Sequence, residues 1–316
     1  MIDVTDRHCR YFHRLLAPRA RLYTEMITTG ALLHGNVGRH LDFDPAEHPV
    51  ALQLGGSEPG DLAQAARLGR QWGYDEINLN CGCPSERVQR GAFGACLMAE
   101  PRLVADCLKA MQDAVDVPVT VKHRLGLDYD DSYGFVRDFV GALFGAGCRV
   151  FHVHARNAVL KGLSPKDNRE IPPLRYADAR RLQADFPDAV FVLNGGLDSA
   201  ETALQAMREF GGAMLGRAAW HDPRILSAIS MQRWPQAGLP SDARVVDAMT
   251  DYARRMVAGG VPLRAIVRPM LGLVNGRSGA RRWRRMLSDA QRLNAEDPEL
   301  IFEAWRALTM APALRA

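Results

Sequence analysis

Seven short apolar runs, rich in Val, Ile and Leu, recur along the first two thirds of the chain and constrain its fold more than any other feature. They occupy residues 21–27, 50–56, 76–82, 117–126, 148–156, 189–196 and 211–219. Between them lie amphipathic stretches with apolar residues at helical spacing, such as residues 59–73, 101–115 and 199–210. Continuous apolar strands joined by helical crossovers predict a parallel sheet covered on both faces, either doubly wound or closed as a barrel.

The number of predicted strands favours a barrel that lacks one strand, because eight strands close an α/β barrel and this chain begins at a helix-like segment. After residue 224 the strand rhythm stops, and only helical patterns separated by Gly and Pro follow. We therefore predict a barrel domain over residues 1–235 and a helical domain over residues 240–316. The chain length of 316 residues accommodates both.

The sequence shows no targeting or membrane segment. Its N-terminal stretch has no apolar core of signal-peptide length, and no run approaches the roughly 18 apolar residues of a membrane span. We expect a cytoplasmic protein with no membrane partner, so its six cysteines are expected to be reduced thiols. A structural zinc site is not favoured, because one residue separates Cys81 from Cys83 and no second pair follows at a suitable distance; no metal site is predicted.

The positive charge of the chain is concentrated near its C-terminal end. Nine arginines and no acidic residue lie between Arg254 and Ser288, although the net charge of the whole chain is only +4. Such a tract predicts an acidic partner, and the alternative is a solvated helix face.

Polar residues follow the predicted strands at the ends where parallel barrels build their active sites. They are Gln53, Asn78, Asn80, Lys122, Arg124, His152, His154, Arg156, Asn194 and Arg217. For any single one of them, the alternative is a satisfied polar residue at the rim of the sheet. Lys122 could form a Schiff base or stabilise an electron-rich ring, whereas His154 and Arg156 suit an anionic or carbonyl-rich ligand.

Glycines mark the ends of the last two predicted strands. Gly195, Gly196 and Gly216 stand where barrels commonly hold a phosphate on backbone N–H groups. A phosphate-bearing cofactor is therefore expected. A Rossmann fold is not favoured, because no Gly-x-Gly-x-x-Gly motif follows a strand.

Eight motifs, in their order along the chain, resemble those of the tRNA-dihydrouridine synthases. They are "YTEM", "LQLGGSEP", "YDEINLNCGCPS", "GAFGACLM", "VTVKHRLG", "VHARNAVLKGLSPKDNREIPPLRY", "NGG" and "MLGRA". The match is closest to the subfamily A type, which reduces uridines 20 and 20a in the D-loop of tRNA. The resemblance implies an FMN-binding (β/α)8 TIM barrel followed by a helical tRNA-binding domain, with NADPH as the electron donor and no protein partner.

The resemblance also implies roles for individual residues. Cys96 matches the proton donor of the family. The positions that match FMN contacts are Met1, Ile2, Gln53, Lys122, His154, Asn194, Gly195, Gly196, Gly216 and Arg217. The positions expected to contact tRNA are Asn80, Phe93, Arg156, Lys166, Arg169, Arg281 and Arg284. Family members have a first strand ending in "APM", and this chain begins at the methionine of that motif, so its first barrel strand is expected to be truncated.

Reduction of the C5=C6 bond of uracil needs a hydride at C6, which reduced flavin can deliver, and a proton at C5, which an acid must deliver. A cysteine thiol, with an ordinary pKa of ~8.5, is protonated near neutral pH and suits Cys96 for this role. Cys83 is interpreted as part of a strand-end turn, and Cys81 as a small core residue.

Two alternatives remain open from the sequence. An FMN barrel acting on a free pyrimidine or another small molecule would explain the strand ends equally well, but not the arginine tract. A tRNA-binding protein that has lost catalysis would explain the tract without the chemistry.

Overall fold

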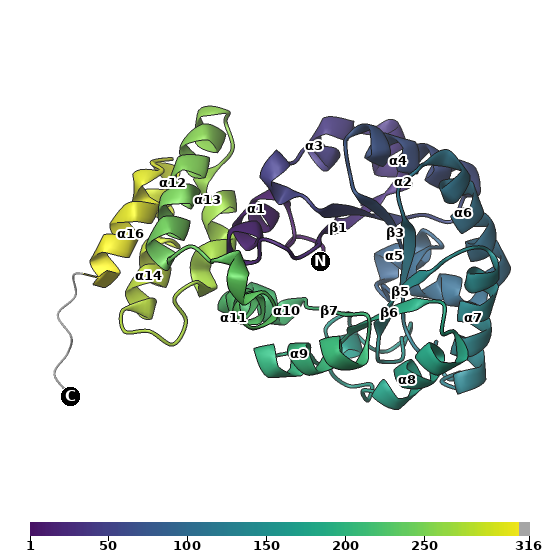
Figure 1. The fold of residues 1–316 in the computed structure, drawn as a ribbon. Helices are drawn as coiled ribbons and strands as arrows, with labels where there is room; N and C mark the ends of the chain where they lie inside the picture. The colour runs from purple at the N-terminus through teal and green to yellow at the C-terminus, as the bar shows by residue number, and fades with distance from the viewer. Residues whose placement is uncertain (310–316) are drawn as a thin grey trace. The chain divides into compact units, whose positions relative to one another are not determined.

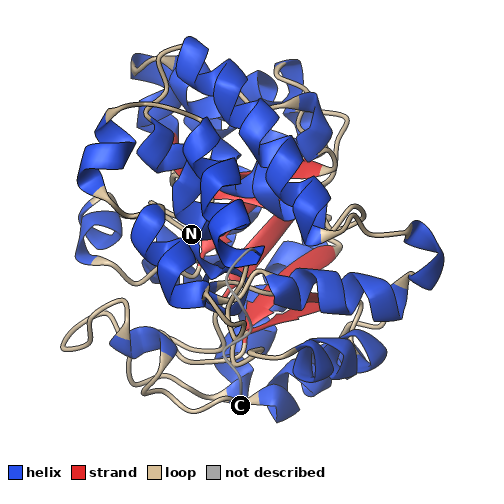
Figure 2. Cartoon of the chain, turned by 90° about the vertical axis from the view of Figure 1, so that its left-hand side faces the viewer, coloured by secondary structure: helices blue, strands red, loops and turns tan. Residues whose placement is uncertain are grey.

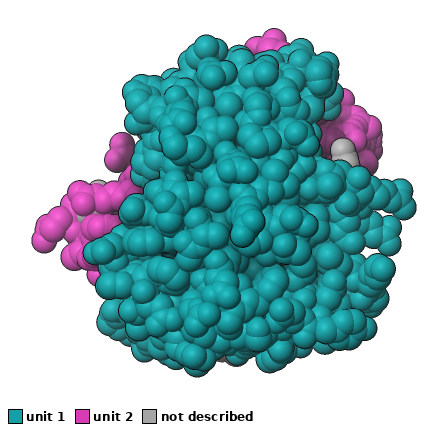
Figure 3. Space-filling model, turned by 90° about the vertical axis from the view of Figure 1, so that its right-hand side faces the viewer, with its two compact units in different colours: residues 1–2, 21–216 teal, residues 3–20, 217–316 magenta. Residues whose placement is uncertain are grey.

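The computed structural model describes residues 1–309, apart from the side chains of residues 87 and 237. It divides into two compact units. The first comprises Met1–Ile2 and Arg21–Gly216, and the second comprises Asp3–Ala20 and the described residues from Arg217 onward. Figure 3 colours the first unit teal and the second magenta.

The first unit is built on a sheet of seven parallel strands, each paired with the one before it in the sequence. The strands are β1 (Leu22–Thr28), β2 (Val50–Gly55), β3 (Glu76–Cys81), β4 (Val119–His123), β5 (Val150–His154), β6 (Val190–Asn194) and β7 (Gly212–Met214). They curl together with helices over their outer side, as in a (β/α)8 barrel (Figure 1). Six of the seven strands lie within a run predicted from the sequence, and β1 extends one residue past its run of residues 21–27, so the predicted fold class is confirmed.

Helical segments connect successive strands and cover the sheet (Figure 2). They are α2 (Thr29–His34), α3 (Val37–Leu41), η1 (Pro45–Glu47), α4 (Pro59–Gln71), α5 (Glu86–Arg90), η2 (Gly94–Ala99), α6 (Pro101–Ala114), α7 (Tyr133–Gly145), η3 (Asp167–Arg169), α8 (Tyr176–Asp185) and α9 (Ala200–Glu209). Several begin where the sequence supplies a cap. The Ser132 hydroxyl, for example, accepts a hydrogen bond of 3.2 Å from the backbone N–H of Phe135 at the start of α7.

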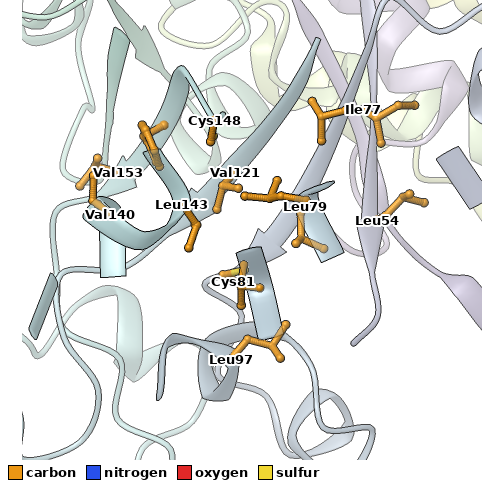
Figure 4. Packing of buried hydrophobic residues seen from close by; sticks show 14 of the residues in the cluster. Leu54, Ile77, Leu79, Cys81, Leu97, Val121, Val140, Leu143, Cys148 and Val153 are labelled. Atoms are coloured by element: carbon orange, nitrogen blue, oxygen red, sulfur yellow. The ribbon is translucent and has the colours of Figure 1, made fainter. Parts of the chain in front are cut away.

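Strands β2 and β3 lie at the centre of the first unit's core. Every residue of these two strands is buried, because helices cover the outer side and the barrel interior encloses the other. Cys81 lies in this core beside Leu97, and its burial raises its pKa well above the ordinary value (Figure 4). The prediction of Cys81 as a small core residue is confirmed.

The second unit is helical. It contains α1 (Arg7–Leu16), α10 (Arg217–His221), α11 (Arg224–Arg233), η4 (Pro235–Ala237), α12 (Asp242–Ala258), α13 (Leu263–Val267), η5 (Arg268–Gly272), α14 (Ala280–Met286), α15 (Ala290–Asn294) and α16 (Glu299–Thr309). Its core gathers apolar side chains from α1, α12, α13, α14 and α16, with Trp283 and Tyr252 fully buried among them.

The boundaries of the compact units differ from the predicted domains of residues 1–235 and 240–316. The N-terminal helix α1 belongs to the helical unit, because Phe12 and Leu16 are buried in its core and the His8 ring nitrogen Nδ1 lies 2.8 Å from the Tyr252 hydroxyl. Helices α10 and α11 also belong to the helical unit, so the division falls after Gly216.

No helix within residues 1–309 combines the length and the hydropathy that crossing a bilayer requires. All six cysteines lie among these residues, and none of them is joined in a disulfide.

Candidate active site

The parallel register brings the polar strand-end residues next to one another. Asn80 on β3 is paired with Lys122 on β4, and Lys122 is paired with His152 on β5. His154, two residues further along β5, is paired with Asn194 on β6. Residues that are far apart in the sequence therefore form one polar surface at the C-terminal ends of the strands.

Lys122 is a half-buried cation without a bound counter-charge. No hydrogen bond or ion pair joins its Nζ to another group in the described part of the chain. Burial, together with the charge of the nearby Arg124 guanidinium, lowers the pKa of Lys122 to about 8. A lysine with this pKa can bind an electron-rich or anionic group, and it loses its charge at mildly alkaline pH.

His154 is a neutral imidazole in cationic surroundings. Burial holds its pKa well below the ordinary value, and the charges of Arg124, Lys122, Arg156 and Arg169 act in the same direction. A buried site with this many positive charges favours a ligand that carries phosphate or several carbonyl oxygens.

Two consecutive glycines let the backbone after β6 approach His154. Gly195 has a φ of +100°, and a Cβ atom there would lie 2.5 Å from His154 Cδ2. Gly196 has a φ of +70°, and a Cβ atom there would lie 2.8 Å from the Tyr176 hydroxyl. The Tyr176 hydroxyl in turn donates a hydrogen bond of 2.7 Å to the Gly195 carbonyl and fixes this turn. The geometry requires glycine at both positions.

The start of the chain lies beside the end of β7. A Cβ atom at Gly216 would lie 3.3 Å from Met1 Sδ, and both Met1 and Ile2 are exposed. Arg217, the next residue, is the first residue of α10 and belongs to the second unit.

Cys96 lies in η2, on the loop that follows β3. Its thiol is half-buried and donates a hydrogen bond of 3.1 Å to the Phe93 carbonyl. Burial raises the pKa of Cys96 above its ordinary value, so the thiol keeps its proton at neutral pH. Gly94 holds this loop against the turn after β3, because its φ is +78° and a Cβ atom there would lie 2.6 Å from the Cys83 carbonyl oxygen.

Ion pairs neutralise part of the arginine tract in the second unit. Arg254 forms ion pairs with Asp251 and Glu299, and Arg277 pairs with Asp242, so acidic residues outside the tract reach two of its members. Helix α14 keeps most of its charge. Its exposed residues Arg281, Arg282 and Arg285 make no ion pair within residues 1–309, and Arg284 contacts only a neutral partner, the Asn275 side-chain oxygen, at 2.7 Å. The buried Trp283 anchors the helix through a hydrogen bond of 3.1 Å to the Met270 carbonyl.

Comparisons with known proteins decide the family. Residues 1–308 match the model described as dihydrouridine synthase (Dus). The chain belongs to the dihydrouridine synthase family. Proteins named tRNA-dihydrouridine(20/20a) synthase from Pseudomonas putida and Pseudomonas aeruginosa are each 52% identical to it, over 96% of this chain and 90% and 91% of theirs. One from Synechocystis is 50% identical over 97% of this chain and 92% of its own.

A solved structure of 2-naphthoyl-CoA reductase in complex with 2-naphthoyl-CoA shares the fold of this dihydrouridine synthase family member. The TM-score is 0.53 at 11% identity, over 72% of this chain and 47% of that one.

The side chain of Asn80 in this Dus-family chain is buried and hydrogen-bonded to neighbouring groups of the protein. Its side-chain oxygen accepts hydrogen bonds from the backbone N–H groups of Gly82 at 3.0 Å and Cys83 at 2.9 Å, and its amide nitrogen donates to Gln53 at 2.9 Å. Asn80 therefore builds the turn after β3, and Cys83 is part of that turn, as predicted. Phe93 lies over the end of β2, since a Cβ atom at Gly55 would meet its ring at 2.9 Å.

Two residues of the Dus-family site organise its loops in a way that the sequence did not reveal. The buried Arg124 guanidinium donates to the carbonyl oxygens of Gly82 at 3.1 Å, Asn157 at 3.1 Å and Asn168 at 2.8 Å. Arg124 thus joins the turn after β3 to the segment that carries Lys166, which is exposed, and Arg169. Asn168 is fully buried and accepts a hydrogen bond of 2.7 Å from the backbone of Val159. Only the tertiary structure shows that these two polar residues point inward.

Proposed function

We propose that this chain is a tRNA-dihydrouridine synthase that reduces uridines 20 and 20a in the D-loop of cytoplasmic tRNA, with FMN as cofactor and NADPH as electron donor. The observation that carries the proposal is a half-buried thiol, Cys96, on the loop that follows β3, together with cationic side chains that gather around His154 at the C-terminal ends of the barrel strands. The substrate is inferred from the names of relatives that are 50–52% identical over nearly the whole chain.

The residues at the strand ends fit FMN. Lys122 offers a cation that no group within residues 1–309 binds, His154 lies among four positive charges, and Gly195 and Gly196 open the backbone to close approach. The proposed FMN contacts are Met1, Ile2, Gln53, Lys122, His154, Asn194, Gly195, Gly196, Gly216 and Arg217. Bound FMN, once reduced by NADPH, supplies the hydride for C6 of the uracil ring.

The protein supplies the proton. Cys96 Sγ holds it at neutral pH because burial disfavours the thiolate, and a neutral thiol can transfer it to C5 of the uracil ring. The turn built by Asn80 and the close contact at Gly94 hold the thiol-bearing loop in place. Pre-positioning of this kind lowers the entropic part of the barrier.

Binding of tRNA is assigned to residues of both units, most of them basic. A uridine must leave its stack to be reduced, at a cost of a few kcal/mol that contacts elsewhere on the tRNA offset. We assign the phosphate contacts to Arg281 and Arg284 on α14, and further tRNA contacts near the barrel to Asn80, Phe93, Arg156, Lys166 and Arg169. Each unit then has one main role, with catalysis in the barrel and tRNA binding in the helical unit.

The substrate class can be tested with the wild-type chain. We expect unmodified tRNA to accelerate NADPH oxidation by the FMN-loaded protein, and free uridine at the same concentration to have little effect. Equal acceleration by free uridine would favour the small-molecule alternative.

Replacing Arg281 and Arg284 together by alanine should raise the apparent KM for tRNA about tenfold near physiological salt, because two phosphate contacts are lost. In a plot of log Kd against log salt concentration, the slope should fall by one to two, because roughly one counterion is released for each phosphate contact. NADPH oxidation in the absence of tRNA should not change.

A matched control for that variant is the double replacement of Arg254 and Arg292 by alanine. It removes the same net charge from the same unit, but these arginines are ion-paired with Asp251, Glu299 and Glu303. We expect its KM to stay within about twofold of wild type. If the KM for tRNA rose equally in the two double variants, the overall positive charge of the unit, rather than α14, would bind tRNA.

The affinity for FMN should depend on pH through Lys122. Its pKa of about 8 means that the cation is present below pH 8 and is lost as the pH rises through that value. We therefore expect the Kd for oxidised FMN to increase between pH 7 and pH 9, measured by flavin fluorescence. Lys122→Met should bind FMN more weakly at pH 7 and show a flatter profile, and an unchanged profile in that variant would show that another group titrates.

A further inference from the structure

A chain of side-chain hydrogen bonds crosses the interior of the barrel below the candidate active site. Asn80 Nδ2 donates to Gln53 Oε1 at 2.9 Å, and Gln53 Nε2 donates to Asn78 Oδ1 at 2.8 Å. Asn78 Nδ2 then donates to Thr120 Oγ1 at 2.7 Å, and Thr120 Oγ1 donates to Glu76 Oε1 at 2.6 Å. All five residues are buried, and strands β2, β3 and β4 supply them.

Both ends of this chain have a fixed polarity. At the upper end, the Asn80 side-chain oxygen faces the backbone N–H groups of Gly82 and Cys83, which can only donate. At the lower end, the Glu76 carboxylate, which is ion-paired with Arg21, can only accept. Every hydrogen bond between these ends must therefore point from Asn80 toward Glu76.

The polarity fixes the side-chain amide of Gln53. An isolated amide can turn over and exchange its oxygen with its nitrogen, but here the oxygen must face Asn80 and the nitrogen must face Asn78. Gln53 has one N–H and one oxygen lone pair left over, and each of them can then point in only one direction.

Glu76 has no other evident use in the chemistry. It lies at the first residue of β3, at the opposite end of the strand from the site, and the Tyr23 hydroxyl also donates to it at 2.9 Å. Burying a carboxylate is costly, even when it is paired, and apolar residues of similar size are often at least as stable in such positions. A role in orienting the chain of hydrogen bonds explains why the carboxylate of Glu76 is buried here.

We propose that Glu76 is a positioning residue, which acts through Thr120 and Asn78 to hold the Gln53 amide in the one orientation that binds the flavin ring. This inference rests on the proposed function, in which Gln53 contacts FMN. Glu76 itself acts three hydrogen bonds away from Gln53, so its effect reaches the cofactor only through the polarity of the chain.

The test is the affinity of the full-length protein for FMN after Thr120→Val. Valine has the shape of threonine but cannot transmit the polarity, and the loss of one orienting hydrogen bond should raise the Kd for FMN about tenfold in a fluorescence titration. Thr120→Ser retains the hydroxyl and should restore the Kd to within about twofold of wild type. Thr250→Val is the matched control, because Thr250 is equally buried but bonds only to the Val246 carbonyl in the helical unit.

Thermal melting separates orientation from stability. A purely structural role for Thr120 would lower the melting temperature and leave the Kd of the folded fraction at its wild-type value, which would overturn the inference. If Thr120→Val does not fold, Glu76→Gln serves instead. The amide of glutamine can donate to Thr120 as well as accept from it, so the hydrogen bonds of the chain no longer have one required direction. The same rise in Kd is expected, and a wild-type Kd would contradict the inference.

The same titration distinguishes this inference from the proposed function. A wild-type chain that does not bind FMN would overturn the proposed function itself. A wild-type chain that binds FMN, together with a Gln53→Ala variant that binds it weakly and a Thr120→Val variant that binds it normally, would overturn only the role of Glu76.

Discussion

Cys96→Ala should lower the rate of uridine reduction at least about a hundredfold, because a positioned general acid contributes 10²–10⁴-fold to such a step. Affinities for FMN and tRNA should stay close to wild type, since the thiol bonds only to the carbonyl of Phe93 within its own loop. The measurement is a single turnover of prereduced enzyme with unmodified tRNA. Because burial raises the pKa of Cys96, loss of this proton should slow the wild-type reaction only at a higher pH than it would for an exposed thiol.

The neighbouring cysteine provides the control for that variant. Cys83 is also half-buried, but it belongs to the turn after β3, where its backbone makes the contacts with Asn80 and Ala95. Cys83→Ala should keep the single-turnover rate within a few fold of wild type. A wild-type rate in Cys96→Ala, or an equal loss in both variants, would remove Cys96 from its assigned role.

Gly195→Ala should nearly abolish FMN binding, with a rise in Kd of at least about a hundredfold. A Cβ atom at this position would lie 2.5 Å from His154 Cδ2, so either the imidazole or the turn after β6 must move, and both belong to the proposed FMN site. The positive φ of +100° adds a backbone cost of about 1–2 kcal/mol for any residue other than glycine. Fluorescence titration of FMN and thermal melting measure the two effects separately.

Gly162→Ala isolates the backbone cost. Gly162 has a similar φ of +90°, but no atom lies within 4 Å of the position that its Cβ would occupy. We expect Gly162→Ala to be destabilised by the backbone cost alone, Gly195→Ala to be destabilised more, and FMN binding to be lost only in Gly195→Ala. Similar FMN affinities in both would mean that His154 does not depend on the close approach of Gly195.

The sequence predicted the sheet well because parallel strands that are buried on both sides leave a strong pattern. Val, Ile and Leu recur within residues 50–56 and 76–82, and the structure buries every residue of β2 and β3. The positions of Lys122 and His154 at strand ends followed from the same pattern, since the register of a parallel sheet aligns the C-terminal ends. The family resemblance, carried by motifs along the whole chain, agrees with the family model that matches residues 1–308.

Features that depend on contacts between distant segments could not be predicted from the sequence. Helix α1 precedes the first strand, and only the burial of Phe12 against helices more than 200 residues later assigns it to the helical unit. The inward orientation of Arg124 and the hydrogen-bond chain that ends at Glu76 likewise depend on which side chains meet inside the barrel. Polar residues at strand ends look alike in a sequence, whether they face a ligand or a neighbouring loop.

The most direct test of the account is position-resolved mapping of dihydrouridine in unmodified tRNA after incubation with this chain, FMN and NADPH, beside the same reaction with Cys96→Ala. The account predicts dihydrouridine at positions 20 and 20a with the wild-type chain and almost none with the variant. Dihydrouridine at other positions would contradict the assigned substrate, and equal product from both proteins would contradict the assigned proton donor. An FMN-loaded wild-type chain that oxidises NADPH but leaves every uridine unchanged would contradict the proposed function as a whole.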